Sequence, residues 1–76
     1  MYLNARDIPD HPWVAQIFSS KSARGGGVVR RSLRDVEREI GYGRLELEVR
    51  RRGYHMVQSG DQIVIFCTSE PLRIIC

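Results

Sequence analysis

The sequence has 76 residues and a net charge of +3, with 42% hydrophobic and 28% charged residues. This length allows one small domain with a thin core, and the composition is that of a folded protein. Two cysteines are too few for a disulfide-rich secreted scaffold, and no apolar run approaches the roughly 20 residues of a membrane-spanning helix. The N-terminus lacks the pattern of a secretory signal. We therefore expect a single small domain over residues 1–76, cytoplasmic and without a membrane partner.

The positive charge is carried almost entirely by arginine, which makes up eleven of the twelve basic residues. Arginine grips phosphate through two parallel hydrogen bonds and stacks on bases, but codon bias in a GC-rich genome also favours it over lysine. The placement is more informative than the count. Basic residues crowd into residues 21–38 and again into residues 50–52.

The first predicted helix follows an irregular stretch, residues 1–9, that shows no usable period. Asp10 is the expected N-cap, and Pro12 suits the first turn because its missing N–H costs nothing there. Apolar residues at helical spacing predict one buried face: Trp13, Val14, Ile17 and Phe18. Residues 19–27 contain three consecutive glycines and are predicted to be a flexible, basic, glycine-rich linker.

The second predicted helix is the best defined element in the sequence. Val28-Val29 before it is either a very short strand or the lead-in to the helix. Ser32 is a good N-cap with Asp35 in the capping-box position. Three apolar residues then mark one helical face before Gly41 ends it: Leu33, Val36 and Ile40.

Residues 44–50 carry conflicting signals. Their strict alternation of apolar and polar residues favours a strand, whereas leucine, glutamate and arginine are good helix formers. Leu45 and Val49 are four residues apart, and Gly53 follows three arginines as it would at a helix C-terminus. We interpret the segment as a helix.

The rest of the chain predicts strands. Residues 54–58 and 62–67 flank Ser59-Gly60-Asp61 as a hairpin, and the continuous apolar run of the second strand favours a central position. Leu72–Cys76 is predicted to be a third strand. The expected fold class is therefore α+β, with two or three short helices packed on a three-stranded antiparallel β-meander. The predicted core is Trp13, Ile17, Leu33, Val36, Ile40, Leu45, Val49, Val57, Ile63, Ile65 and Ile74.

This order of elements resembles a winged helix-turn-helix, in which the last helix enters the DNA major groove. The resemblance implies a recognition helix over residues 44–52 and a wing tip at Ser59-Gly60-Asp61. Two features depart from the family. Only eleven residues separate Gly41 from Gly53, so the helix is short, and Glu46 and Glu48 would bring negative charge toward DNA.

Two weaker resemblances carry no activity over. A helix ending in Arg-Arg-Gly-Tyr before a hairpin resembles toxin ribonucleases of the HicA type, but the Gly-Ser-His that bears their catalytic histidine is missing, and His55 is followed by Met56. The stretches GGVVRRSLRDVEREIG and EVRRRGYH resemble short uncharacterised bacterial proteins that sometimes carry a phosphoribosylanthranilate isomerase name. That name implies a barrel of roughly 200 residues or more, which 76 residues cannot build.

Other chemistries lack their motifs. Gly25-Gly26-Gly27 has no following Lys-Ser or Lys-Thr pair, as a phosphate-binding loop requires. The side chains that could bind a metal are His11, His55, Cys67 and Cys76, and no two of them have the short spacing of metal ligands. No metal, cofactor or catalytic residue is therefore predicted. The sequence does not favour an enzyme.

We therefore expect a small non-enzymatic nucleic-acid-binding protein with an arginine-rich face. The residues expected to contact nucleic acid are Arg30, Arg31, Arg34, Arg44, Arg50, Arg51 and Arg52, with Arg44 reaching toward bases. This function requires the two arginine groups to lie side by side. The alternative is a protein-binding adaptor, or an inhibitor of the phage or plasmid type, that uses the same arginines on an acidic partner. A homodimer through an edge strand at Leu72–Cys76 is a further alternative.

Overall fold

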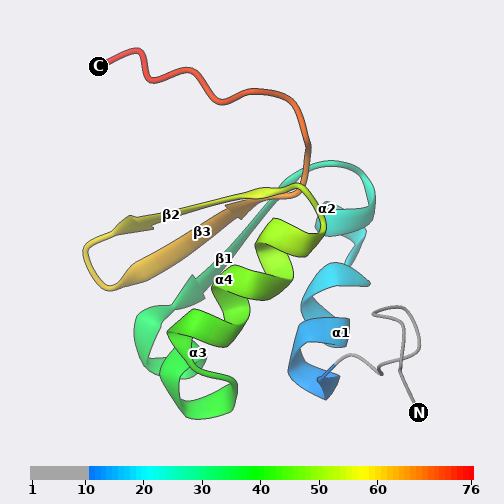
Figure 1. Cartoon of the computed structure of the whole chain (residues 1–76), viewed down its shortest axis with the longest axis vertical. Helices are drawn as coiled ribbons and strands as arrows, with labels where there is room; N and C mark the ends of the chain where they lie inside the picture. The colour runs from blue at the N-terminus through cyan, green and yellow to red at the C-terminus, as the bar shows by residue number, and fades with distance from the viewer. Residues whose placement is uncertain (1–10) are drawn as a thin grey trace, which may run out of the picture.

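The computed structural model describes residues 11–76, so residues 1–9, predicted to be irregular, and Asp10 lie outside the described part of the chain. The N-cap of the first helix is His11, whose Nδ1 accepts a hydrogen bond from the Trp13 N–H at 3.1 Å, and not Asp10 as predicted. Residues 11–76 form four helices and three strands (Figure 1). In chain order these are α1 Pro12–Phe18, α2 Lys21–Arg24, β1 Val28–Ser32, α3 Leu33–Glu39, α4 Tyr42–Arg51, β2 His55–Ser59 and β3 Gln62–Phe66.

The three strands form one antiparallel sheet in the order β1-β3-β2. The apolar run of β3 lies at its centre, which confirms the expected central position. Ile65 of β3 pairs with Val29 of β1 on one side and with Met56 of β2 on the other. Gly60 has a φ of 60° at the first position of the two-residue turn between β2 and β3, a conformation that glycine adopts without strain.

The predicted class, α+β with a three-stranded antiparallel sheet, is confirmed, but the predicted third strand is wrong. β1 takes that place, and Leu72–Cys76 has no strand partner in the described chain. The main-chain N–H of Cys67 donates to Gly27 O at 2.9 Å, which extends the β1–β3 pairing beyond β1. Because β1 and β2 occupy both edges of β3, the sheet is not a meander, and Val28-Val29 is a strand.

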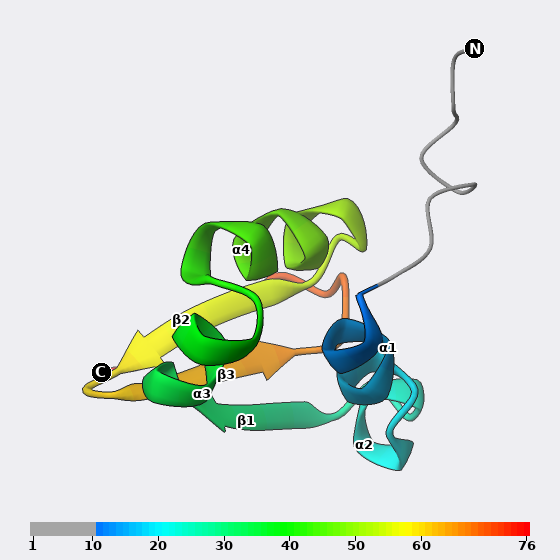
Figure 2. The same cartoon turned by 90° about the horizontal axis from the view of Figure 1, so that it is seen from below.

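The core lies between the helices and one face of the sheet, with α3 and α4 on the same side (Figures 1 and 2). Alternate residues of the strands are buried there, as the 4%, 0% and 0% exposure of Val29, Ile63 and Ile65 shows. The opposite face has no helix over it in the described chain. The buried hydrophobic residues are Val14, Ile17, Ala23, Val29, Val36, Leu45, Val49, Ile63, Ile65 and Cys67.

Two residues that were predicted to lie in the core are exposed instead. Val57 is 37% exposed because it lies on the uncovered face of β2, and Ile74 is 81% exposed because the segment after β3 joins no sheet. Three other predicted members are only partly buried and pack at the margin of the core: Trp13, Leu33 and Ile40.

The helices after β1 begin and end largely as predicted. Ser32 Oγ accepts a hydrogen bond from the Asp35 N–H at 3.1 Å, which confirms the N-cap of α3. Residues 44–50 are helical, as interpreted from the sequence, and α4 extends past them at both ends, so Gly43 lies inside the helix. Gly53 follows the C-cap of α4 with a φ of 74°, as expected of a helix-ending glycine.

The glycine-rich stretch 19–27 contains the single-turn helix α2. Ser20 Oγ caps it by accepting from the Ala23 N–H at 3.3 Å, and Ala23 is buried in the core. The chain then folds back tightly, since the Gly27 N–H donates to Ser22 O at 2.7 Å. A Cβ on Gly27 would lie 2.9 Å from that same oxygen, so this position requires glycine for close approach.

We expect Gly27→Ala to destabilise the fold by about 1–3 kcal/mol, because the added methyl meets main chain that must shift. Gly43→Ala is the matched control. A Cβ there meets no atom within 4 Å and replaces a helical glycine, so it should stabilise by up to about 1 kcal/mol. Urea unfolding of the two variants measures both values. Equal effects would contradict the close contact at Gly27.

Candidate functional site

The structure divides the seven arginines predicted to contact nucleic acid into two groups. Arg30 and Arg31 lie on β1 and Arg34 in the first turn of α3, whereas the others belong to α4 and its C-cap. Arg50 lines a groove beside β2, and β1 and β2 are opposite edges of the sheet. The two groups therefore do not form the single arginine-rich surface on which the sequence-based hypothesis depends.

The first group belongs to a larger strip that we call the basic edge: Lys21, Arg24, Arg30, Arg31 and Arg34. These residues come from α2, β1 and the start of α3, which follow one another along one edge of the molecule (Figure 2). No acidic residue occurs between positions 12 and 34. No ion pair joins any of the five to a carboxylate of residues 11–76.

Lys21 and Arg24 were not among the predicted site residues, although a sequence signal for them exists. Both are exposed and belong to the same acid-free stretch as Arg30 and Arg31. Counting carboxylates along the chain, in addition to arginines, would have identified them. The uncompensated positive charge of the described chain is therefore concentrated at the β1 edge of the sheet.

The arginines of α4 are largely paired with carboxylates of the same helix. Arg50 Nη2 lies 2.8 Å from Glu46 Oε2, and Arg51 Nη2 lies 2.7 Å from Glu48 Oε1. The Arg50–Glu46 pair is exposed, and pairs of this kind contribute only about 0–1 kcal/mol, so this one is easily exchanged for another partner. Both pairs reduce the positive field of the helix. Arg44 is exposed on the same helix and has no ion pair to residues 11–76.

Arg52 is held in internal contacts. Its guanidinium lies 4.2 Å from the centre of the Phe18 ring, and Nη1 donates to Glu48 Oε1 at 2.8 Å and to the Glu48 carbonyl at 3.0 Å. Phe18 in turn packs against Tyr54, with 5.9 Å between ring centres. The Arg52 side chain is only 19% exposed. Arg52 thus connects the end of α4 to α1.

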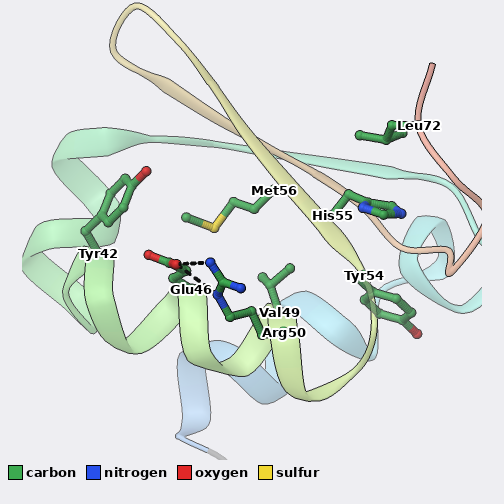
Figure 3. A pocket seen from close by; sticks show the side chains of 8 residues that line it. All are labelled: Tyr42, Glu46, Val49, Arg50, Tyr54, His55, Met56 and Leu72. Carbon is green, nitrogen blue, oxygen red and sulfur yellow. Dashed lines mark hydrogen bonds and ion pairs between the residues drawn. The ribbon is translucent and has the colours of Figure 1, made fainter. Parts of the chain in front are cut away.

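A groove, which we call the α4–β2 groove, lies between α4 and β2 (Figure 3). β2 is the edge of the sheet opposite to β1, the strand that carries Arg30 and Arg31 of the basic edge. The volume of the groove is about 330 Å³. The side chains around it come from α4, β2, the loop between them and the segment after β3: Tyr42, Glu46, Val49, Arg50, Tyr54, His55, Met56 and Leu72. The sequence offered no signal for this site, because packing alone brings these separate segments together.

Some polar groups of the groove already form hydrogen bonds within residues 11–76. Arg50 Nε and Nη2 both donate to Glu46 Oε2, at 2.9 and 2.8 Å, and no bond within residues 11–76 occupies Glu46 Oε1. His55 Nε2 lies 2.7 Å from the carbonyl oxygen of Glu70 and donates to it, which holds the segment after β3 beside the first residue of β2. The groove therefore offers Glu46 Oε1 as an acceptor for one cation, close to the apolar side chains of Val49 and Met56.

Two side chains have shifted pKa values. Burial raises the pKa of the Cys67 thiol, and the charge of Arg52 opposes this shift only in part, so Cys67 is not an activated nucleophile. The hydrogen bond to Glu39 and the charge of Asp35 raise the pKa of Arg38, which remains a cation. Residues 11–76 contain no group of three or more His, Cys, Asp or Glu side chains that could hold a metal ion.

None of the helices of residues 11–76 is long and apolar enough to cross a membrane. The chain matches no known protein-family model, no curated protein and no solved structure.

Replacing Arg52 should affect folding more than replacing its exposed neighbour. We expect Arg52→Gln to lower the free energy of unfolding by about 1–2 kcal/mol, because the contact over Phe18 and the bonds to Glu48 are lost. Arg50→Gln removes one exposed ion pair and should change it by less than about 1 kcal/mol. Thermal or urea unfolding measures both. Equal losses would contradict the internal role of Arg52.

The two cysteines should differ in reactivity in the folded protein. Cys76 is exposed, whereas Cys67 is buried with a raised pKa, so a thiol reagent should label Cys76 quickly and Cys67 only after unfolding. Mass spectrometry of native and denatured samples over time counts the labels. Rapid double labelling of the folded protein would contradict the burial of Cys67.

Proposed function

We propose that the protein binds nucleic acid without catalysing a reaction and holds the phosphate backbone against the basic edge. The observation that carries the proposal is the acid-free run of five basic side chains along α2, β1 and the start of α3. A phosphate backbone is a line of closely spaced negative charges. A strip of cations without neighbouring carboxylates suits such a polymer, because each bound cation releases a counterion.

The shape of the strip also supports an extended partner. β1 is an edge strand of five residues and therefore spans about 17 Å at about 3.3 Å per residue. Arg30 points to the uncovered face of the sheet and Arg31 to the opposite face, with α2 and Arg34 continuing the strip at its two ends. Several phosphates of one strand can therefore be contacted together.

A winged-helix manner of binding is a second way in which the same function could be carried out. The order α1, β1, α3, α4, β2, β3 with sheet order β1-β3-β2 resembles that of winged helices, and α4 would then enter the major groove. The outward face of α4 offers Arg44, Leu47 and Arg51, with Leu47 66% exposed. Glu46 and Glu48 on the same helix disfavour this manner relative to the basic edge.

The experiment compares two variants of equal charge. The edge variant carries Arg30→Gln, Arg31→Gln and Arg34→Gln, and the helix variant carries Arg44→Gln, Arg50→Gln and Arg51→Gln. Binding to fluorescent duplex and single-stranded DNA and RNA is titrated from about 50 to 200 mM salt. Because both variants lose three charges, long-range attraction changes equally and a difference between them reports local contacts.

We expect wild-type affinity to fall steeply with salt, and the edge variant to bind at least tenfold more weakly with a log–log salt slope reduced by about two to three. The helix variant should lose less. A larger loss in the helix variant would replace the basic edge with α4 as the contact surface. If the wild-type protein shows no affinity for any of the four ligands at about 50 mM salt, the proposed function is wrong.

A further inference from the structure

The segment after β3 carries the two most exposed large hydrophobic side chains of the described chain, Ile74 and Ile75, which are 81% and 78% exposed. Leu72 of the same segment is 39% exposed. Thr68–Glu70 leads into this segment, and the Glu70 carbonyl is held by His55. No main-chain hydrogen bond joins residues 71–76 to any other part of residues 11–76. We call residues 71–76 the C-terminal segment; it is extended and leads away from the sheet (Figure 1).

The free edge of β2 lies close to where this segment begins. The two-residue turn makes Ser59 and Gln62 the closing hydrogen-bonded pair of the hairpin, so every second residue of β2 bonds to β3. The main-chain groups of Met56 and Gln58 therefore point outward. Unpaired groups on an edge strand can bond an added strand of another chain.

The α4–β2 groove adjoins this free edge and suits the composition of the C-terminal segment. Its floor includes Val49 and Met56, and its acidic member is Glu46, whose Oε1 has no partner within residues 11–76 (Figure 3). The segment has one charged residue, Arg73, among apolar ones. In a strand, Arg73 and Ile75 point to the same side. That side can place Ile75 on the apolar floor and Arg73 beside Glu46.

We propose that the C-terminal segment of one copy of the chain adds to β2 of a second copy as an antiparallel strand and fills that copy's α4–β2 groove. The second copy returns its own segment to the first, so that the contact is closed and two-fold symmetric. Leu72 then leaves the lining of its own groove, and Leu72 and Ile74 lie on the uncovered face of the partner sheet, beside the 37% exposed Val57. This association does not depend on nucleic-acid binding.

The C-terminal segment fits the groove of a second copy better than the groove of its own copy. The bond between His55 and Glu70 holds the segment at the first residue of β2, so folding back onto the same β2 would run it parallel to that strand. Parallel pairing is slightly less stable per residue than antiparallel pairing. A segment from another copy can enter in the antiparallel direction, and reciprocal exchange covers the exposed isoleucines of both chains.

The experiment measures the mass of the 76-residue chain over a concentration series by sedimentation equilibrium. The donor variant carries Ile74→Asp and Ile75→Asp; both residues are highly exposed, so the monomer fold should be unaffected. The matched control carries Gln16→Asp and Leu47→Asp, which add the same charge at exposed positions away from the groove. We expect wild type and control to form dimers, and the donor variant to dissociate at least tenfold more readily.

A third variant tests the receiving strand. Gln58→Pro removes an outward N–H that β3 does not use, and its ring obstructs strand addition, so it should also weaken the dimer at least tenfold. Circular dichroism checks that the hairpin still folds. Three results overturn the proposal. The first is a wild-type protein that stays monomeric, whether or not its residues 72–76 are protected from amide exchange. The others are a donor variant that dimerises as tightly as wild type, and a folded Gln58→Pro variant that does so.

Discussion

The antiparallel pairing of β3 with its hairpin neighbour β2 and with β1, a strand from a distant part of the chain, holds residues 11–76 together. Val28 lies opposite Phe66, so the first and last strands of the sheet are joined across half of the sequence. Ile63 and Ile65 are completely buried in the middle of this pairing and contribute the centre of the core. In so short a chain, the helices have no other apolar surface of comparable size against which to pack.

This arrangement explains which elements could be predicted from the sequence. Local signals were enough for the Ser32 cap, the hairpin at Gly60 and the central position of β3, because each depends on neighbouring residues. The third strand could not be found in this way. Leu72–Cys76 and Val28–Ser32 both carry strand-forming residues, and only the long-range pairing with β3 decides between them.

The candidate site was predictable to a smaller extent. Arginine clusters are visible in the sequence, but a cluster becomes a binding surface only if its charges remain uncompensated after folding. The helical spacing of Glu46 and Glu48 relative to Arg50 and Arg51 predicts pairing once residues 44–50 are known to be helical. The contact between Arg52 and Phe18 could not be predicted from helical spacing, because it depends on how α1 packs. The α4–β2 groove has no sequence signature at all.

The hairpin tip is tied to the body of the protein by a main-chain bond. The N–H of Leu33, the first residue of α3, donates to the carbonyl of Asp61 at 2.7 Å. The amide at a helix start has no acceptor within its own helix, so the turn supplies one. The hairpin tip is therefore coupled to the start of α3. A longer turn, or one moved away from the sheet, would leave the Leu33 N–H without this acceptor and loosen the junction between β1 and α3.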